Sequence, residues 1–140
     1  MNVKKVIKLL RQKYPNKTII ENKNSKRITT EIICEIESTN KHSHYSIAIA
    51  VIDSSTIHYH RKITEIYKVM KGNLKVFKYN IKRNFYKEYI IKRNKSITIK
   101  PGEIHSNLGK ETWVECYSKP GWLIDDYINL EEILKKYILR

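Results

Sequence analysis

Cysteine is scarce in this sequence: Cys34 and Cys116 are the only two in 140 residues. A chain of this length can bury a hydrophobic core without covalent staples. Two thiols in a cytosolic protein are more often small buried side chains than a disulfide. We therefore predict two free thiols.

Long hydrophobic runs are absent as well. No apolar stretch approaches the roughly 18 residues that a membrane span needs, and the first ten residues mix lysine with aliphatic residues. A secretory signal requires an uninterrupted apolar stretch followed by small residues. The sequence therefore predicts a cytoplasmic protein that does not associate with a membrane.

Acidic residues are few, with 14 Asp and Glu against 28 Lys and Arg, which gives a net charge of +14. Such an excess is typical of proteins that bind nucleic acids. Here, however, the basic residues are spread along the chain and never form a block of five. We therefore do not expect a nucleic-acid partner, although the charge favours an anionic small-molecule ligand.

The pattern of apolar residues predicts a single domain over residues 1–140, with no repeat or linker. Helical spacing in residues 2–14 and 129–139 predicts a short helix at each end. Between them, short segments rich in β-branched and aromatic residues alternate with turn-forming residues, which predicts an all-β sandwich or barrel over residues 18–118. We expect strands near residues 18–21, 27–37, 45–52, 57–60, 64–70, 74–80, 85–92, 96–99, 103–106 and 112–118.

The segment HYHRKITEIYKVMKG, residues 58–72, carries the most informative motif. His58 and His60 are two residues apart, so on a strand both side chains point to the same face. Glu65 follows after a gap that fits a tight turn, and much later a Pro-Gly turn precedes His105. Three imidazoles and one carboxylate suit a divalent transition metal such as Fe, Mn, Ni or Zn, and leave positions open for a substrate. We predict one such metal on these four residues.

The spacing of this segment, H-x-H, four residues, E, six residues, G, resembles the first motif of the cupin superfamily. The stretch from Gly102 to His105 resembles the second motif, and the likeness covers roughly residues 45–126. The resemblance implies a cupin barrel, also called a double-stranded β-helix or jelly roll, with short helices at the N- and C-termini. The positions that differ from the motifs carry no metal ligand: Ile52 and Asn94 replace Gly, Lys100 replaces Pro, and Gly109 replaces Asn.

Two further residues are candidates for catalysis. Tyr67 lies two residues after Glu65 and so faces the same way, where it acts as an acid, as a stacking surface for substrate or as part of the barrel core. Glu115 becomes a candidate general base if its side chain points into the barrel. A second histidine pair, His42 and His44, has no glutamate at the required distance, and we interpret it as exposed polar residues.

The resemblance implies a metal-dependent enzyme of the dioxygenase or the sugar isomerase/epimerase type, acting on a small polar or anionic molecule chelated to the metal. One fold hosts unrelated chemistries, so a non-catalytic metal- or ligand-binding module remains the alternative, and a nucleic-acid-binding protein a more distant one. We also expect a homodimer. Residues 27–37 are too apolar for a bare sheet edge, so they either lie inside a sheet or extend one across a two-fold interface.

Overall fold

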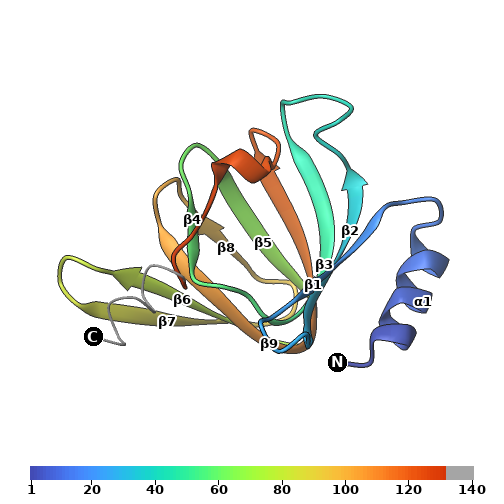
Figure 1. Ribbon diagram of the computed structural model, residues 1–140, viewed down its shortest axis with the longest axis horizontal. Helices are drawn as coiled ribbons and strands as arrows, with labels where there is room; N and C mark the ends of the chain where they lie inside the picture. Colours follow the sequence, from blue (N-terminus) through green and yellow to red (C-terminus); the bar gives the residue numbers. More distant parts are fainter. Residues whose placement is uncertain (132–140) are drawn as a thin grey trace.

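A computed structural model describes residues 1–131 of the chain. It begins with a helix and continues almost entirely as antiparallel strands (Figure 1). The elements are α1 (Val3–Lys13), β1 (Ile19–Lys23), β2 (Thr29–Glu37), β3 (Ser46–Ser54), β4 (His58–His60), β5 (Thr64–Lys71), β6 (Leu74–Asn80), β7 (Phe85–Ile91), β8 (Ser96–Ile99), β9 (Ile104–Lys119), the short 3₁₀-helix η1 (Ile124–Asp126) and β10 (Tyr127–Asn129). The prediction of an all-β fold is confirmed.

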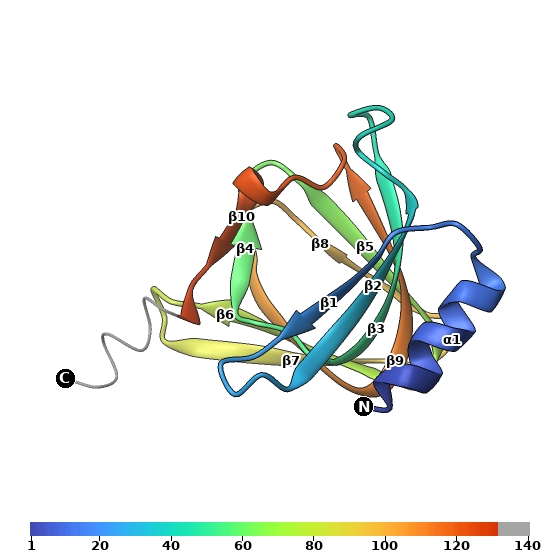
Figure 2. The same ribbon diagram turned by 45° about the vertical axis from the view of Figure 1, so that its right-hand side comes forward.

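The strand β9 organises the sheet, which curls into a half-barrel (Figures 1 and 2). Its first half pairs with β4 and β6, and its second half pairs with β3 and β5. The strands β2 and β1 continue the sheet beyond β3, while β8, β7 and β10 pair with β5, β6 and β4, respectively. One long strand therefore joins the two faces of the barrel.

The helix α1 lies against the outside of the barrel, across β2 (Figure 2). Val6 and Leu10, one turn apart on the helix, are buried against Ile32, Val51 and Trp113. A separate cluster fills the inside of the barrel, where alternate residues of each strand point. It consists of Ala50, Ile52, Tyr67, Val69, Leu74, Val76, Ile91, Ile99 and Val114.

Two of the predicted elements need correction. The segments 103–106 and 112–118 belong to the single strand β9, in which an irregularity at Glu111 (φ 46°) interrupts the regular geometry. The predicted second helix does not begin at residue 129, because Asn129 ends β10, where its pairing with β4 prevails over helical spacing. The rest of that predicted helix, residues 132–139, lies outside the described residues.

The apolar segment 27–37 forms β2, which lies between β1 and β3. Of the two alternatives, it therefore lies inside a sheet, and the neighbouring edge belongs to β1. Cys34 and Cys116 are free thiols, as predicted. Within residues 1–131, no helix has both the length and the apolar character that crossing a membrane requires.

Candidate metal centre

Three strands bring together the four side chains that the sequence singled out. His58 and His60 lie on β4, Glu65 lies at the start of β5, and His105 lies on β9 directly opposite His58 in the strand register. One ligand atom from each residue lies within 4.8 Å of the others. All four side chains are buried, which removes them from competing water.

Backbone carbonyls fix the orientation of two of the imidazoles. The Nδ1 atoms of His58 and His105 lie 2.7 Å and 3.0 Å from the carbonyl oxygens of Thr56 and Glu103. A neutral imidazole that donates from Nδ1 keeps a lone pair on Nε2, and this arrangement is typical of metal-binding histidines.

His60 supplies the test of fit for a metal. It is 2% exposed, its Nδ1 has no partner within residues 1–131, and its Nε2 lies 3.4 Å from Oε2 of Glu65 without forming a regular hydrogen bond. A buried polar atom without a partner is costly and calls for an explanation. The four residues therefore fit a divalent metal.

The main-chain oxygen of His60 accepts a hydrogen bond from the backbone N–H of Gly102 (φ 80°), so the turn before His105 is tied to this strand.

Electrostatics favour the metal-binding forms of His58 and Glu65. Burial, together with the charge of neighbouring His105, lowers the pKa of His58 to about 4, so its imidazole is neutral at pH 7. Burial alone would raise the pKa of Glu65, but the neighbouring imidazoles of His105 and His60, 3.5 Å and 3.4 Å from its Oε2, outweigh it and hold that pKa well below its usual value. Neutral imidazoles and an ionised carboxylate are the forms that bind metals.

Tyr67 reaches the same centre. Its hydroxyl donates to Oε2 of Glu65 at 2.6 Å and lies 3.2 Å from Nε2 of His105. Burial, reinforced by the charge of Glu65, raises the pKa of Tyr67 well above its usual value, so the phenol keeps its proton. Tyr67 is therefore placed to donate a hydrogen bond beside the cluster.

Glu115 does not join the site. On β9, His105 belongs to the inward-facing four-residue cluster and Asn107 lines the cavity, whereas beyond Glu111 it is Cys116 and Ser118 that line it. The irregularity at Glu111 shifts the alternation by one residue, so Glu115 lies on the opposite face of the strand from Cys116. The condition on which its catalytic role depended, an inward side chain, is not met.

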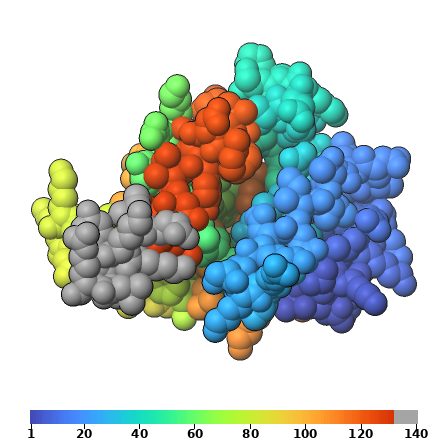
Figure 3. All heavy atoms as spheres, in the orientation of Figure 1, coloured from blue at the N-terminus to red at the C-terminus, as the bar shows by residue number. Residues whose placement is uncertain are grey.

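A cavity of about 360 Å³ adjoins the cluster (Figure 3). Figure 3 shows the hollow between the C-terminal segment, drawn in red, and the N-terminal strands, drawn in blue. His58, His60, Glu65 and Tyr67 form part of its wall. Its volume suits one small molecule. Further lining residues come from β1, β2 and β3 and from residues 38–40 and 122–124.

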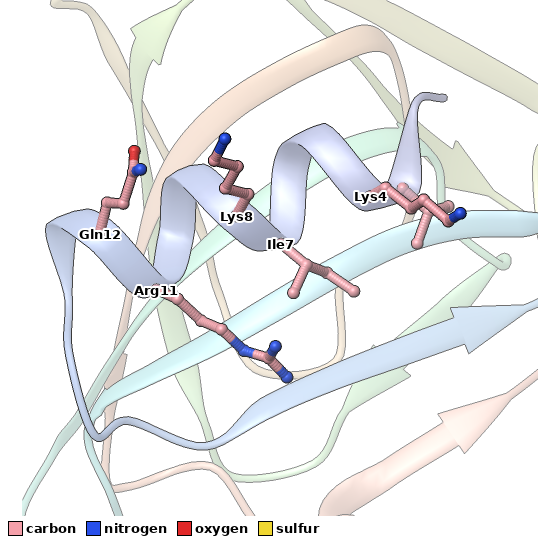
Figure 4. Close-up of a pocket in the computed structure, with 6 residues that line it drawn as sticks. Lys4, Ile7, Lys8, Arg11 and Gln12 are labelled. Atoms are coloured by element: carbon pink, nitrogen blue, oxygen red, sulfur yellow. The ribbon is translucent and has the colours of Figure 1, made fainter.

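The charges of this cavity differ from those of the molecule as a whole. Glu31, Glu35 and Glu37 line it, and no Lys or Arg of the described residues does. By contrast, a shallow hollow on α1 is lined by basic side chains, Lys4, Lys8 and Arg11 among them (Figure 4). The positive charge of the protein thus lies outside the cavity.

Sequence reasoning missed the C-terminal segment that holds β4 in place. Asp126 is buried and accepts hydrogen bonds from the backbone N–H groups of Lys62 and Ile63, in the turn between β4 and β5. The ring of Tyr127 stacks on His58 with 4.7 Å between centroids, and its hydroxyl is hydrogen-bonded to Thr56. No spacing rule links these residues to a motif more than sixty positions earlier.

The second histidine pair stays outside the centre. Nε2 of His42 lies 3.2 Å from a carboxylate oxygen of Glu37, and the rings of His42 and His44 stack at 5.7 Å. Neither residue belongs to the four-residue cluster.

Comparison with known proteins rests on structure alone, because no family model and no curated protein matches the sequence. The nucleoside dehydratase Pac13 from Streptomyces superimposes with a TM-score of 0.65, at 10% identity over 81% of this chain and 83% of its own. Oxalate decarboxylase from Bacillus subtilis gives 0.69, at 13% identity over 89% of this chain and 34% of its own. The iron(II) form of HppE gives 0.61, at 8% identity over 76% and 57%.

All three are cupin-fold proteins. This chain has the cupin fold. The match confirms the fold implied by residues 58–72 and 102–105, and at these identities it establishes the fold alone.

Proposed function

We propose that this protein is a metal-dependent cupin enzyme that binds one divalent transition metal on His58, His60, Glu65 and His105 and acts on a small polar molecule in the adjoining cavity. The observation that carries the proposal is the buried cluster itself, with four ligand atoms within 4.8 Å on the wall of a cavity of about 360 Å³. The buried nitrogens of His60 support it, because neither makes a regular hydrogen bond within residues 1–131 and a metal would satisfy one of them.

The side chains of this chain would divide the work. A bound metal supplies Lewis-acid chemistry, or oxygen activation if it is iron, at positions that the four ligands leave open. Tyr67, whose hydroxyl proton is donated to Glu65, can accept a hydrogen bond from a ligand held beside that carboxylate. We retain the dioxygenase and the sugar isomerase/epimerase types as reaction classes.

A non-catalytic binding module is the second candidate. One observation favours it: with Glu115 facing away, Tyr67 is the one side chain of the two catalytic candidates that reaches the site. Such a module would hold the same metal and ligand without turnover. Only a turnover measurement on metal-loaded protein separates the two candidates.

An anionic ligand, which the net charge favours, is not part of this proposal, because the lining of the cavity within residues 1–131 holds carboxylates and no Lys or Arg.

We also propose a homodimer. The edge strand β1 is mostly exposed and offers unpaired backbone groups that a second copy can extend. Light scattering that finds a monomer would contradict the dimer.

The metal is tested first. Protein purified without added metal should contain about one transition-metal ion per chain by elemental analysis, as the single four-ligand cluster predicts. Turnover is then screened with small polar compounds on metal-loaded and metal-depleted protein. Activity that requires the metal supports the enzyme, binding without turnover supports the module, and protein that takes up no metal contradicts both.

A further inference from the structure

The inner face of β2 carries an unusual amount of negative charge for this protein. Glu31, Glu35 and Glu37 lie on one strand together with Ile33 and all line the cavity, while the chain as a whole carries a net charge of +14. Within residues 1–131, no Lys or Arg side chain lines the cavity. Within residues 1–131, none of these three carboxylates forms an ion pair with Lys or Arg, and half-buried carboxylates are costly unless something donates to them.

These carboxylates differ in how far they are already engaged. Glu37 contacts His42 at 3.2 Å, and one oxygen of Glu31 accepts a long hydrogen bond of 3.4 Å from Asn22. Within residues 1–131, no side chain donates to the carboxylate of Glu35. Glu35 and the second oxygen of Glu31 are therefore open acceptors on the cavity wall.

An independent acceptor faces the same cavity from β9. Asn107 is 5% exposed, and its Oδ1 atom has no hydrogen-bond partner among the described residues. It lies two residues beyond His105 on the same side of the strand, next to the candidate metal centre. A buried amide oxygen of this kind is normally paired, so it points to a donor that the protein itself does not supply.

We propose that the cavity beyond the metal is a subsite for hydrogen-bond donors, and that its ligand is an uncharged or cationic molecule rich in hydroxyl or amino groups, of the size of a monosaccharide or an amino sugar. The inference rests on the proposed function and names the class of molecule that the site takes. Donors on the ligand would satisfy Glu31, Glu35 and Asn107 together, and charge-assisted hydrogen bonds to carboxylates are the stronger kind.

The mouth of the cavity fits such a ligand. Trp122 lines it and is 39% exposed, so its ring offers a face to the incoming molecule. An indole face attracts an ammonium group and also packs against apolar C–H groups. A carboxylate ligand, by contrast, would meet like charges along β2, and like-charge contacts oppose binding.

Three probes of matched size test the proposal on the full-length, metal-loaded protein: glucose, glucosamine and glucuronate. Their binding is measured by calorimetry on the unmodified protein and on Glu35→Gln. We expect glucosamine to bind tightest and glucuronate about tenfold or more weakly. Glu35→Gln should weaken glucosamine binding by about tenfold, because it replaces a charge-assisted hydrogen bond with a neutral one.

The matched control is Glu88→Gln. Glu88 is exposed on β7, is paired with Lys75 at 3.2 Å and does not line the cavity, so this variant should bind all three probes as the unmodified protein does. The proposal is overturned if glucuronate binds as tightly as glucosamine, if no probe binds, or if Glu35→Gln and Glu88→Gln behave alike.

The metal content of every sample separates this inference from the proposed function. One metal per chain with no preference for donor-rich probes overturns only the subsite. Absence of metal overturns the proposed metal centre, and the probe series on that metal-free protein still reports on the acidic wall, since β2 carries no proposed ligand of the metal.

Discussion

The three strands β2, β3 and β9 present two contrasting faces. On the outer face, Ile32 of β2 and Val51 of β3 are fully buried beneath Leu10 of α1. On the inner face, one residue further along, Ile33 and Glu35 of β2 line a hollow. The alternation of side chains along a strand allows one stretch of backbone to serve both purposes.

The two faces differ in what they contribute. The outer face buries aliphatic side chains in a dry, close-packed layer, which stabilises the fold. The inner face keeps carboxylates, a buried amide and four metal-binding groups around a cavity, which costs stability and gives binding capacity. Substitutions on the two faces should therefore separate metal binding from stability.

The largest effect should come from His60→Ala on the inner face. Removing one of the four ligands should weaken metal binding by far more than the roughly 10- to 100-fold typical of residues behind the ligands. The free energy of unfolding of the metal-free protein should change less than in a core truncation, because His60 lines an existing cavity and the contact of its Nε2 with Oε2 of Glu65 is long, at 3.4 Å. Elemental analysis and urea unfolding of the metal-depleted protein measure the two effects. Unchanged metal content would refute the assignment.

Leu10→Ala should do the reverse on the outer face. Leu10 is 0% exposed within the cluster beneath α1, so truncating it should lower the free energy of unfolding by about 2–5 kcal/mol. Metal content should stay at one per chain, because α1 contributes nothing to the four-residue cluster. Urea unfolding with elemental analysis tests this. A variant that loses the metal while folded would show that the two faces are not independent.

Much of this division was predictable from local pattern. His58, His60 and Glu65 lie within eight residues, so strand alternation and one tight turn were enough to bring them together. His105 required the family's spacing as well, because nothing in the intervening residues states which strands pair. The strand positions were likewise predicted closely from β-branched segments and the turns between them.

The remainder depended on features without a local signal. The face of Glu115 is set by the irregularity at Glu111, and a period-two pattern cannot register a one-residue shift inside a strand. The strand β10 forms because it pairs with β4, a contact distant in sequence. The charge of the cavity could not be inferred from the net charge, since net charge does not state which side chains face inward.

A smaller effect should come from Asp126→Asn, which acts through the turn between β4 and β5. The Asp126 carboxylate accepts hydrogen bonds from Lys62 and Ile63 at 3.0–3.2 Å, and an amide replaces one acceptor oxygen with a donor. Because that turn sets the distance between His60 and Glu65, metal affinity should fall by roughly tenfold. Asp125→Asn is the control, because Asp125 is adjacent and exposed. Titration of metal into both variants measures the difference, and equal affinities would show that the turn does not depend on Asp126.

The smallest effect should be the pH dependence that Glu31 gives the inner face. Burial, and then the charge of Glu65, raises the pKa of Glu31 from 4.5 to about 7. A carboxyl whose pKa is raised by folding holds its proton more tightly in the folded state, so this cost is absent near pH 4 and grows until the pH exceeds 7. In metal-free protein, Glu31→Gln should therefore be more stable than the unmodified protein at pH 8, with the difference shrinking to nothing near pH 4. Urea unfolding at a series of pH values measures the difference, with the exposed Glu88→Gln as the control. A stability difference that does not vary with pH would contradict the raised pKa of Glu31, and with it the contrast between the two faces.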